Sequence, residues 1–332
     1  MLKKILFAIV AVVLILGIIG VLLPRHAHVT RSVSIDRPAS LVYATVNSFQ
    51  LFPAWSPWQD LDPNMHQSTA GPRDGVGAKL VWSGNDKVGS GTQLITASTP
   101  NQSVASDLDF GSMGAAKSVM TMTSEGSGTR VTWALDIDMG ANPIGHYIGL
   151  TMDRMIGNDF GNGLAKLKSL VESMPNADIT GFTAQEVQLD AQPVLLVAET
   201  AAFDAIGKAY ADGFGRIGAF MAKNKLQQSG APFGVEGTMS PDKYAFDAGI
   251  PVDRGGAAPA DGVRVAQSYA GKALKTTHVG AYEALPQTQA KLSAYMAAHG
   301  YSSAGAMIES FIDDPGKVAA EKVRTDIYAP IR

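Results

Sequence analysis

The chain begins with a run of nineteen residues, Ile5 to Leu23, that contains no charged or strongly polar side chain. Inside a bilayer every backbone N–H and C=O group must find its partner within the segment, so a run of this kind folds as a helix. At 1.5 Å per residue such a helix spans about 28 Å, close to the hydrocarbon thickness of a bilayer. We therefore expect residues 1–25 to form one transmembrane anchor that contacts the lipid bilayer through Ile5–Leu23.

The charges that flank the run predict its orientation. Lys3 and Lys4 precede it, and the positive-inside rule then places the N-terminus in the cytoplasm and the soluble domains outside. Arg25 and Arg31 lie on the other side and act against this assignment. A cleaved signal peptide is the alternative, but it has a shorter apolar region and small residues at its cleavage site, whereas Pro24 and Arg25 follow here.

Length and composition limit what the remainder can be. A chain of 332 residues predicts about two domains. Lys and Arg number 27 against 30 Asp and Glu, so nothing in the net charge favours a nucleic-acid partner. The absence of cysteine excludes disulfides, thiolate nucleophiles and cysteine-bound metals. The histidines have no metal-ligand spacing, and we expect neither a metal nor a cofactor.

A domain boundary is predicted near Met174–Asp178, where a helical pattern gives way to a strand-like one. All four tryptophans precede this point, and seven of the nine tyrosines follow it. We expect one domain over residues 26–174, a linker over 175–183 and a second domain over 184–332.

The first of these domains has the pattern of a mostly antiparallel sheet closed by a helix. Alternating residues over Val29–Ile35 predict a strand, and Asp36 before Pro38 predicts a capped short helix. Further strands are predicted over Ala78–Trp82, Gly91–Ala97, Ser103–Phe110, Lys117–Thr123 and Thr129–Asp138. Apolar residues then recur at spacings of three and four, which predicts one long helix with a buried stripe. The stripe consists of Ile144, Ile148, Met152, Met155, Ile156, Phe160, Leu164, Leu167, Val171 and Met174.

This order resembles the SRPBCC superfamily, also called START-like or polyketide cyclase-like. Three segments support the resemblance: the opening Ser32–Ala39, the Trp55–Trp58 segment, and Gly128–Trp133 in a late strand. The resemblance implies a helix-grip fold with a hydrophobic cavity between sheet and helix. It implies no single chemistry, because a fold does not determine a function.

The second domain contains an internal repeat. Ala202–Ile206 matches Ala281–Leu285 at an offset of 79 residues, and Gly230 matches Gly305 at an offset of 75. Each copy predicts a strand, a helix and two further strands, over about residues 190–252 and 270–332. Two such copies side by side leave a groove between their helices, and interfaces of this kind are common ligand sites.

Three segments of the second domain resemble the GyrI-like family, the effector-binding domain of bacterial transcription activators. They are His278–Leu285, Phe311–Pro315 and Glu321–Ile331. The resemblance implies that an aromatic or cationic small molecule binds in the groove, with an acidic residue on the last strand as countercharge. Asp326 occupies that position, where the family usually has glutamate. Some members of the family hydrolyse strained cyclopropane-type compounds with an acidic residue and a tyrosine or tryptophan.

An aromatic groove with a carboxylate suits a lipophilic cation, since rings supply cation–π contacts and the carboxylate supplies the countercharge. By the period of two in a strand, Asp326 and Tyr328 share one face. The predicted ligand-binding residues are Phe203, Tyr282, Glu283, Phe311, Asp326 and Tyr328. Ordinary structural roles remain open for the same residues: Tyr282 and Glu283 at a helix start, and Asp326 in an ion pair.

The pattern as a whole predicts an α+β protein: an N-terminal transmembrane helix, a helix-grip domain, and a duplicated α+β domain. We expect a small-molecule-binding protein for hydrophobic or cationic ligands, anchored by a single pass in the inner (cell) membrane of a bacterium. No DNA-binding element precedes the second domain. The alternative is a hydrolase or cyclase-like enzyme, with Glu283 or Asp326 as its acid–base residue.

Overall fold

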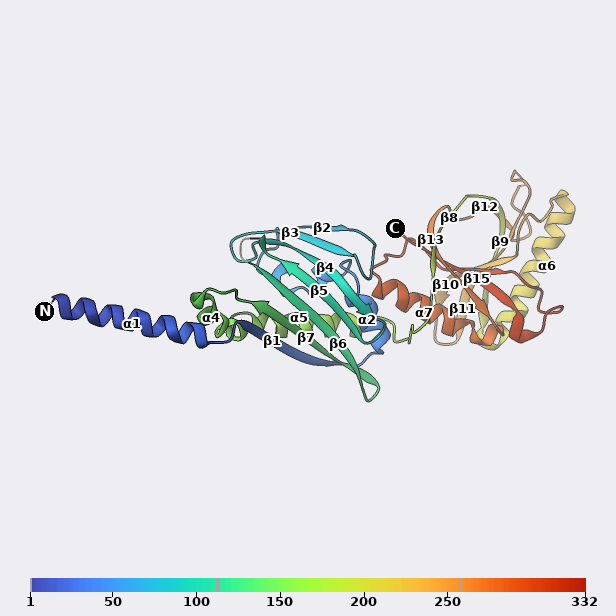
Figure 1. Cartoon of the computed structure of the whole chain (residues 1–332). Coiled ribbons are helices and arrows are strands. Elements are labelled where there is room, and N and C mark those ends of the chain that lie inside the picture. Colours follow the sequence, from blue (N-terminus) through green and yellow to red (C-terminus); the bar gives the residue numbers. More distant parts are fainter. Residues whose placement is uncertain (1, 112–113, 257) are drawn as a thin grey trace. The chain divides into compact units, whose positions relative to one another are not determined.

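The structure, a computed structural model, describes residues 2–111, 114–256 and 258–332 (Figure 1). Met1, the first residue of the predicted anchor segment, lies outside them. The chain divides into two compact units, with the change from the first to the second after Thr180. Each unit holds one antiparallel sheet with helices, which confirms the predicted α+β class.

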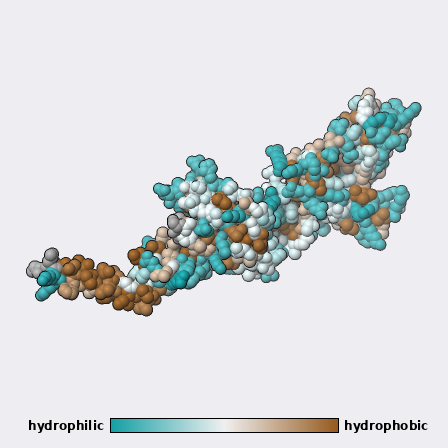
Figure 2. All heavy atoms as spheres, turned by 45° about the horizontal axis from the view of Figure 1, so that its top comes forward, coloured by the Kyte–Doolittle hydropathy of each residue, from teal (hydrophilic) through white to brown (hydrophobic). Residues whose placement is uncertain are grey.

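The chain starts with helix α1 (Leu2–Leu22). In the part of the chain that the structure describes, α1 is the one helix long and apolar enough to cross a membrane; a signal sequence has the same properties. Its apolar side chains are almost all exposed, and Figure 2 shows them as a continuous brown rod. The structure therefore agrees with a membrane-inserting segment of either kind.

The first unit is a seven-stranded antiparallel sheet in the order β1-β7-β6-β5-β4-β3-β2. Its strands are β1 (His26–Ile35), β2 (His66–Ala70), β3 (Lys79–Ser83), β4 (Ser90–Thr99), β5 (Ser103–Asp109), β6 (Ala115–Glu125) and β7 (Gly128–Asp138). Three short helical segments connect β1 to β2: α2 (Ala39–Val46), α3 (Phe52–Trp55) and η1 (Pro57–Gln59). Two more helices follow β7, namely α4 (Pro143–Gly149) and α5 (Met152–Glu172), and the sheet curves around α5 (Figure 1).

Two details of the first unit differ from the expectation. Asp36 does not cap the short helix: the residue before α2 is Pro38, and the Asp36 carboxylate accepts a hydrogen bond from Ser127 Oγ at 3.3 Å. Strand β2 was not predicted, because its sequence HQSTA is polar and mostly exposed at the sheet edge.

The closing helix is broken, contrary to the prediction of one continuous helix. Residues 150–151 separate α4 from α5, and Asn142 begins α4 by accepting from the backbone N–H of Ile144 at 3.0 Å. The stripe is buried from Phe160 onward, where Phe160, Leu164, Leu167 and Val171 of α5 are at most 1% exposed. It is not buried at its start: Ile144, Ile148 and Met155 are exposed.

Aromatic rings make up the centre of the first unit. Trp133 on β7 and Phe160 on α5 stack with their ring centroids 4.0 Å apart. Trp55 and Trp58 meet the Trp133 ring edge-on, at 5.5 and 5.8 Å. Since Phe160 is 1% exposed, it joins the helix to the sheet through contacts that water does not reach.

The second unit is an eight-stranded sheet in the order β12-β9-β11-β10-β14-β15-β13-β8. Its strands are β8 (Gln185–Leu189), β9 (Pro193–Ala202), β10 (Phe233–Met239), β11 (Lys243–Pro251), β12 (Arg264–Gln267), β13 (Gly271–Val279), β14 (Ile308–Phe311) and β15 (Arg324–Pro330). Its helical segments are η3 (Phe203–Ala205), α6 (Ile206–Asn224), η4 (Tyr282–Ala284), α7 (Leu285–Ala298) and η5 (Ala320–Lys322).

The repeat is visible in this unit as β9-α6-β10-β11 followed by β13-α7-β14-β15. Each copy has its own apolar core, one containing Ile217 of α6 and the other containing Leu292 of α7. The two copies meet where β10 pairs with β14, with Gly234 opposite Glu309. The duplication therefore folds into one continuous sheet.

We expect Phe160→Ala to lower the free energy of unfolding of the first unit by roughly 3–5 kcal/mol, because it removes a buried ring and leaves a cavity. All tryptophans lie in this unit, so tryptophan fluorescence during denaturant unfolding of the full chain measures the change. Phe203→Ala is the matched control, since Phe203 belongs to the second unit and is 47% exposed. An unchanged tryptophan transition in Phe160→Ala contradicts the prediction.

Candidate functional site

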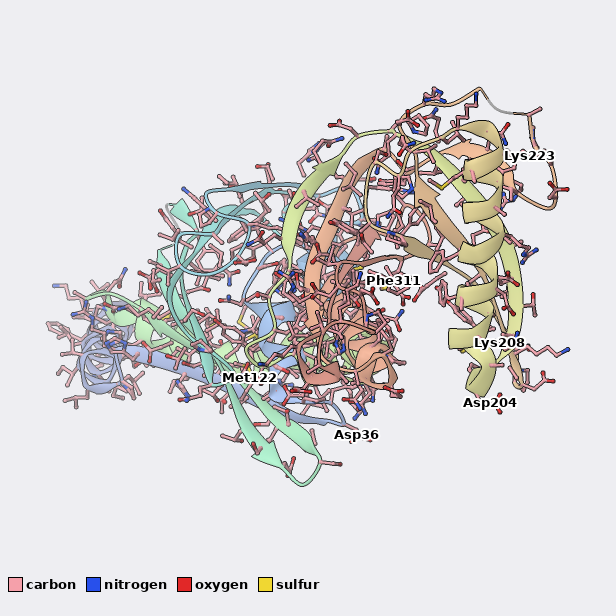
Figure 3. All side chains as sticks on the ribbon, turned by 90° about the vertical axis from the view of Figure 1, so that its right-hand side faces the viewer. Asp36, Met122, Asp204, Lys208, Lys223 and Phe311 are labelled. Atoms are coloured by element: carbon pink, nitrogen blue, oxygen red, sulfur yellow. The ribbon has the colours of Figure 1, made fainter. Side chains whose placement is uncertain are left out.

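A groove of about 1130 Å³ lies between the starts of α6 and α7 over the middle of the second sheet. Its walls come from α6 and from η4 with α7, and its floor comes from β10, β11 and β14. Figure 3 shows Phe311 of β14 beside α6, with Asp204 and Lys208 near the start of that helix. The groove thus forms where the two copies of the repeat meet.

Two carboxylates from neighbouring strands enter this groove. Glu309 on β14 is register partner of Gly234 on β10, so Glu236, two residues further along β10, points to the same face. Gln289 on α7 donates from Nε2 to Oε1 of Glu236 at 2.8 Å and also to Oε1 of Glu309. Because both oxygens accept from one nitrogen, they are no more than about 6 Å apart.

Burial changes the protonation of this pair. Glu309 is only 6% exposed, and burial, with a smaller contribution from the charge of Glu236, raises its pKa to about 7. Burial also raises the pKa of Glu236. Two like charges this close in a poorly hydrated site disfavour double ionisation, so the pair holds a proton into the neutral range.

Aromatic rings surround the carboxylates. Tyr210 lies 4.2 Å from Phe246 and 5.2 Å from Phe311, and Tyr282 lies 5.6 Å from Phe311, between ring centroids. Burial raises the pKa of Tyr210 and of Tyr244 above the usual value, so both phenols stay neutral. Glu236 and Glu309 are therefore the carboxyl groups on the floor of the groove, whereas Asp204, Glu283, Asp313 and Asp314 line it elsewhere.

Glycine is required at one point of the groove floor. The hydroxyl of Tyr210 occupies the place that a Cβ on Gly234 would take. A side chain at position 234 would force the Tyr210 hydroxyl to move, so this glycine makes room for Tyr210 in its present position.

Four of the predicted ligand-binding residues line this groove: Phe203, Tyr282, Glu283 and Phe311. Glu283 lies in η4 and is exposed. The prediction missed Glu309, although a period of two from Phe311 places Glu309 on the same face of one strand. Glu236 carries no such signal, because only the strand register brings it beside Glu309.

Asp326 and Tyr328 lie elsewhere. On β15, Ile327 is opposite Glu309 and shares its face, whereas Asp326 is opposite Ser310 and points to the other side of the sheet. The Asp326 carboxylate accepts from Thr277 Oγ1 at 2.6 Å and pairs with Lys275 Nζ at 2.8 Å. A one-residue difference in strand position thus separates it from the groove.

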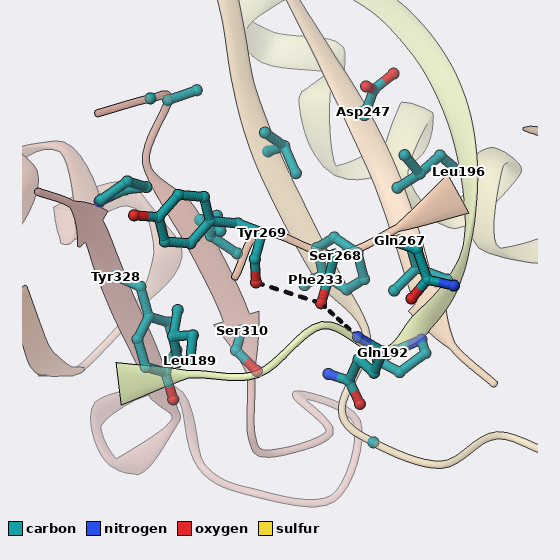
Figure 4. A pocket seen from close by; sticks show the side chains of 18 of the residues that line it. Leu189, Gln192, Leu196, Phe233, Asp247, Gln267, Ser268, Tyr269, Ser310 and Tyr328 are labelled. Carbon is teal, nitrogen blue, oxygen red and sulfur yellow. Dashed lines mark hydrogen bonds between the residues drawn. The ribbon is translucent and has the colours of Figure 1, made fainter. Parts of the chain in front are cut away.

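A second, smaller cavity of about 370 Å³ lies on that other side of the sheet (Figure 4). Tyr328, Phe233 and Asp247 are among its lining residues. Two loops at its edge are hydrogen-bonded to each other: the backbone N–H of Gln192 donates to Ser268 Oγ at 3.1 Å, and the Ser268 N–H donates to the Gln192 carbonyl at 2.9 Å.

The first unit has a cavity of its own, about 260 Å³ in volume, between the sheet and α5. Its lining is mostly apolar and includes the rings of Trp58, Trp82 and Phe160. Ser118 Oγ is occupied, because it accepts from Trp133 Nε1 at 2.9 Å. Gln67 Oε1 and Ser56 Oγ are buried and have no partner in the residues that the structure describes, which leaves two polar atoms for a ligand.

Both units match known protein families. Residues 26–172 match the family described as polyketide cyclase/dehydrase and lipid transport, and residues 183–332 match the GyrI-like small molecule binding domain. These matches confirm the two predicted resemblances. No curated protein matches the chain at a significant level.

Solved structures are similar at low sequence identity. The C-terminal domain of EcmrR has a TM-score of 0.41 at 18% identity, with 45% of this chain and 97% of that one covered. An uncharacterized conserved protein from Listeria innocua has a TM-score of 0.36 at 14% identity, covering 45% and 92%. Ara h 8.0201 has a TM-score of 0.33 at 11% identity, covering 45% and 99%.

We expect Glu309→Gln to make the chain more stable than wild type at neutral pH. Native Glu309 keeps its proton up to a pKa of about 7, whereas the unfolded chain releases it near 4.5. The free energy of unfolding of the wild type therefore falls as pH rises between these values. The glutamine variant does not lose stability in this way. The difference between its free energy of unfolding and that of the wild type therefore grows with pH and reaches up to roughly 3 kcal/mol.

Denaturant unfolding followed by circular dichroism between pH 4 and 8 measures this difference. Glu283→Gln is the control, because it removes an exposed carboxylate at the same groove. If Glu309→Gln and wild type lose stability in parallel as pH rises, Glu309 does not ionise in the way described.

Proposed function

We propose that this chain, in which a polyketide cyclase/dehydrase and lipid transport domain precedes a GyrI-like small molecule binding domain, is a membrane-anchored binding protein whose groove takes a lipophilic cation. The observation that carries the proposal is the pair Glu236 and Glu309 inside an aromatic groove. A buried carboxyl group is costly to ionise alone, but its ionisation becomes favourable once a cation lies beside it.

Gln289 marks the place for the positive charge. Its amide nitrogen bonds both carboxylates and so occupies the point between them. A cationic group at that point gains from two carboxylates at once, whereas the neutral amide gains from hydrogen bonding alone. Tyr210 and Phe311 line the same groove, and their rings add cation–π and dispersion contacts.

The cavity of the first unit suits a different ligand. Its lining is mainly apolar, with Gln67 Oε1 and Ser56 Oγ as unpartnered polar atoms. We assign to it a hydrophobic molecule with one or two hydrogen-bonding groups. The two units then bind separate ligands, because neither cavity draws lining residues from both.

Contacts between α1 and α4 support the interpretation of α1 as a retained anchor. His146 Nδ1 lies 2.7 Å from the Gly20 carbonyl oxygen, and Tyr147 donates its hydroxyl to the Leu16 carbonyl at 2.8 Å. Removal of α1 as a signal peptide would expose His146, which is 7% exposed. With Lys3 and Lys4 in the cytoplasm, the soluble units lie outside it.

A hydrolase is the second candidate, and one observation favours it. A carboxyl group with a pKa of about 7, such as Glu309, is suited to general acid–base catalysis at neutral pH. This candidate moves the acid–base role from Glu283 or Asp326 to Glu309. It requires turnover that disappears in Glu309→Gln.

We expect tetraphenylphosphonium to bind the full chain and tetraphenylborate, of the same shape and opposite charge, to bind far more weakly. Glu309→Gln should weaken tetraphenylphosphonium binding by about tenfold or more, because a hydrogen-bonded or paired buried charge contributes upwards of 1.5 kcal/mol. Isothermal titration calorimetry on the detergent-solubilised chain measures both affinities.

Asp326→Asn is the matched control. It also removes one carboxylate from the second unit, but on the opposite face of the sheet, so its affinity for tetraphenylphosphonium should equal that of the wild type. Equal affinities of wild type and Glu309→Gln, or tighter binding of the borate, would falsify the proposed cation site.

A further inference from the structure

Exposed apolar side chains gather where α4 passes into α5. Ile144, Ile148, Leu150 and Met155 are 67%, 46%, 60% and 61% exposed. Single exposed apolar residues are common, but four within twelve residues form a patch, and such patches indicate an interaction surface. We refer to these four residues as the α4 patch.

The α4 helix packs against the last turns of α1 and is hydrogen-bonded to them. Pro143 and Tyr147 lie against Gly20, whose carbonyl also bonds His146. The Tyr147 hydroxyl reaches the Leu16 carbonyl. At 1.5 Å per residue, these contacts fall about 5 and 10 Å from the Leu23 end of the apolar run. If α1 spans a bilayer, α4 therefore lies in the outer part of the hydrocarbon core, within about 10 Å of the headgroups.

The apolar side of α4 is not the side that faces α1. Pro143 and Tyr147 are four residues apart and share the face in contact with α1. Ile144 and Ile148 follow one residue later, about 100° around the helix. They point into whatever surrounds α1 at this level, which for a membrane-spanning helix is lipid.

We propose that the α4 patch inserts into the outer interface of the bilayer in which α1 is anchored. This inference rests on the proposed anchoring role of α1 and adds a second point of membrane contact. Tyr147 has the amphipathic ring typical of membrane interfaces. Arg154 is exposed and has no ion pair within the described residues, so it is available to a lipid phosphate.

The patch also adjoins the cavity of the first unit. Met152 and Ile156 line that cavity from the first turns of α5, while Met155 between them belongs to the patch. Insertion of the patch would hold this wall of the cavity at the lipid surface. The bilayer itself then becomes the nearest source of a hydrophobic ligand.

The chain has no cysteine, so a single introduced cysteine takes one environment-sensitive fluorophore. We would label Ile148→Cys in the patch, Leu14→Cys in α1, and Val76→Cys in the loop before β3. Val76 is the matched control, because it is apolar, 60% exposed and in the same unit. The full chain is reconstituted into vesicles of phosphatidylcholine and phosphatidylglycerol, with and without phosphatidylcholine that carries a nitroxide near the headgroup.

We expect the headgroup nitroxide to quench the Ile148→Cys label severalfold more strongly than the Val76→Cys label. The Leu14→Cys label should be quenched by a second lipid whose nitroxide lies deeper in the acyl chains. Quenching at Leu14 but not at Ile148 overturns the inference and leaves the anchor in place. A shielded Ile148 label that lipid nitroxides do not quench identifies a protein partner and also overturns it. If no label is quenched, the anchor and the patch both fail.

Discussion

The pairing of β10 with β14 is the constraint on which the groove depends. It joins two copies of one unit into a single sheet, with Gly234 opposite Glu309 at the junction. Because side chains alternate along a strand, this register decides that Glu236 and Glu309 face the helices together. A slip of one residue would carry one of them to the opposite face.

The same junction explains why a carboxyl group in the groove keeps its proton into the neutral range. Gln289 satisfies one oxygen of each carboxylate, and the surrounding rings supply no countercharge. The proposed preference for a cation follows, because an uncharged ligand leaves the cost of ionisation uncompensated, whereas a cation removes it. The cavity of the first unit differs from the groove, because its core of stacked rings leaves an apolar space with few polar atoms.

The sequence was sufficient for features that depend on periodicity and repetition. Alternation located most strands of the first sheet, and the repeat predicted the order of strands and helices in the second unit. The motif containing Phe311 located the groove. Asp326 could not be distinguished from Glu309 in this way, since sheet face depends on the register between strands that are distant in the chain.

The break between α4 and α5 could not be predicted from the sequence for a related reason. Apolar residues recur at helical spacing on both sides of it, and periodicity does not say whether lipid or protein covers them. Ile144 and Phe160 belong to one sequence stripe, yet one is 67% exposed and the other 1%. If a bilayer covers the exposed part, as we propose, the stripe looks uniform in sequence because both surroundings are apolar.

The position of Glu309 has an evolutionary consequence. Gly234 and Glu309 are separated by the 75 residues that relate the two copies of the repeat, and they pair with each other. An ancestor with two identical copies would have placed either two carboxylates or two glycines side by side. Only after the copies diverged could one strand contribute the charge while the other made room for Tyr210. Asymmetry within the duplication is thus the origin of the site.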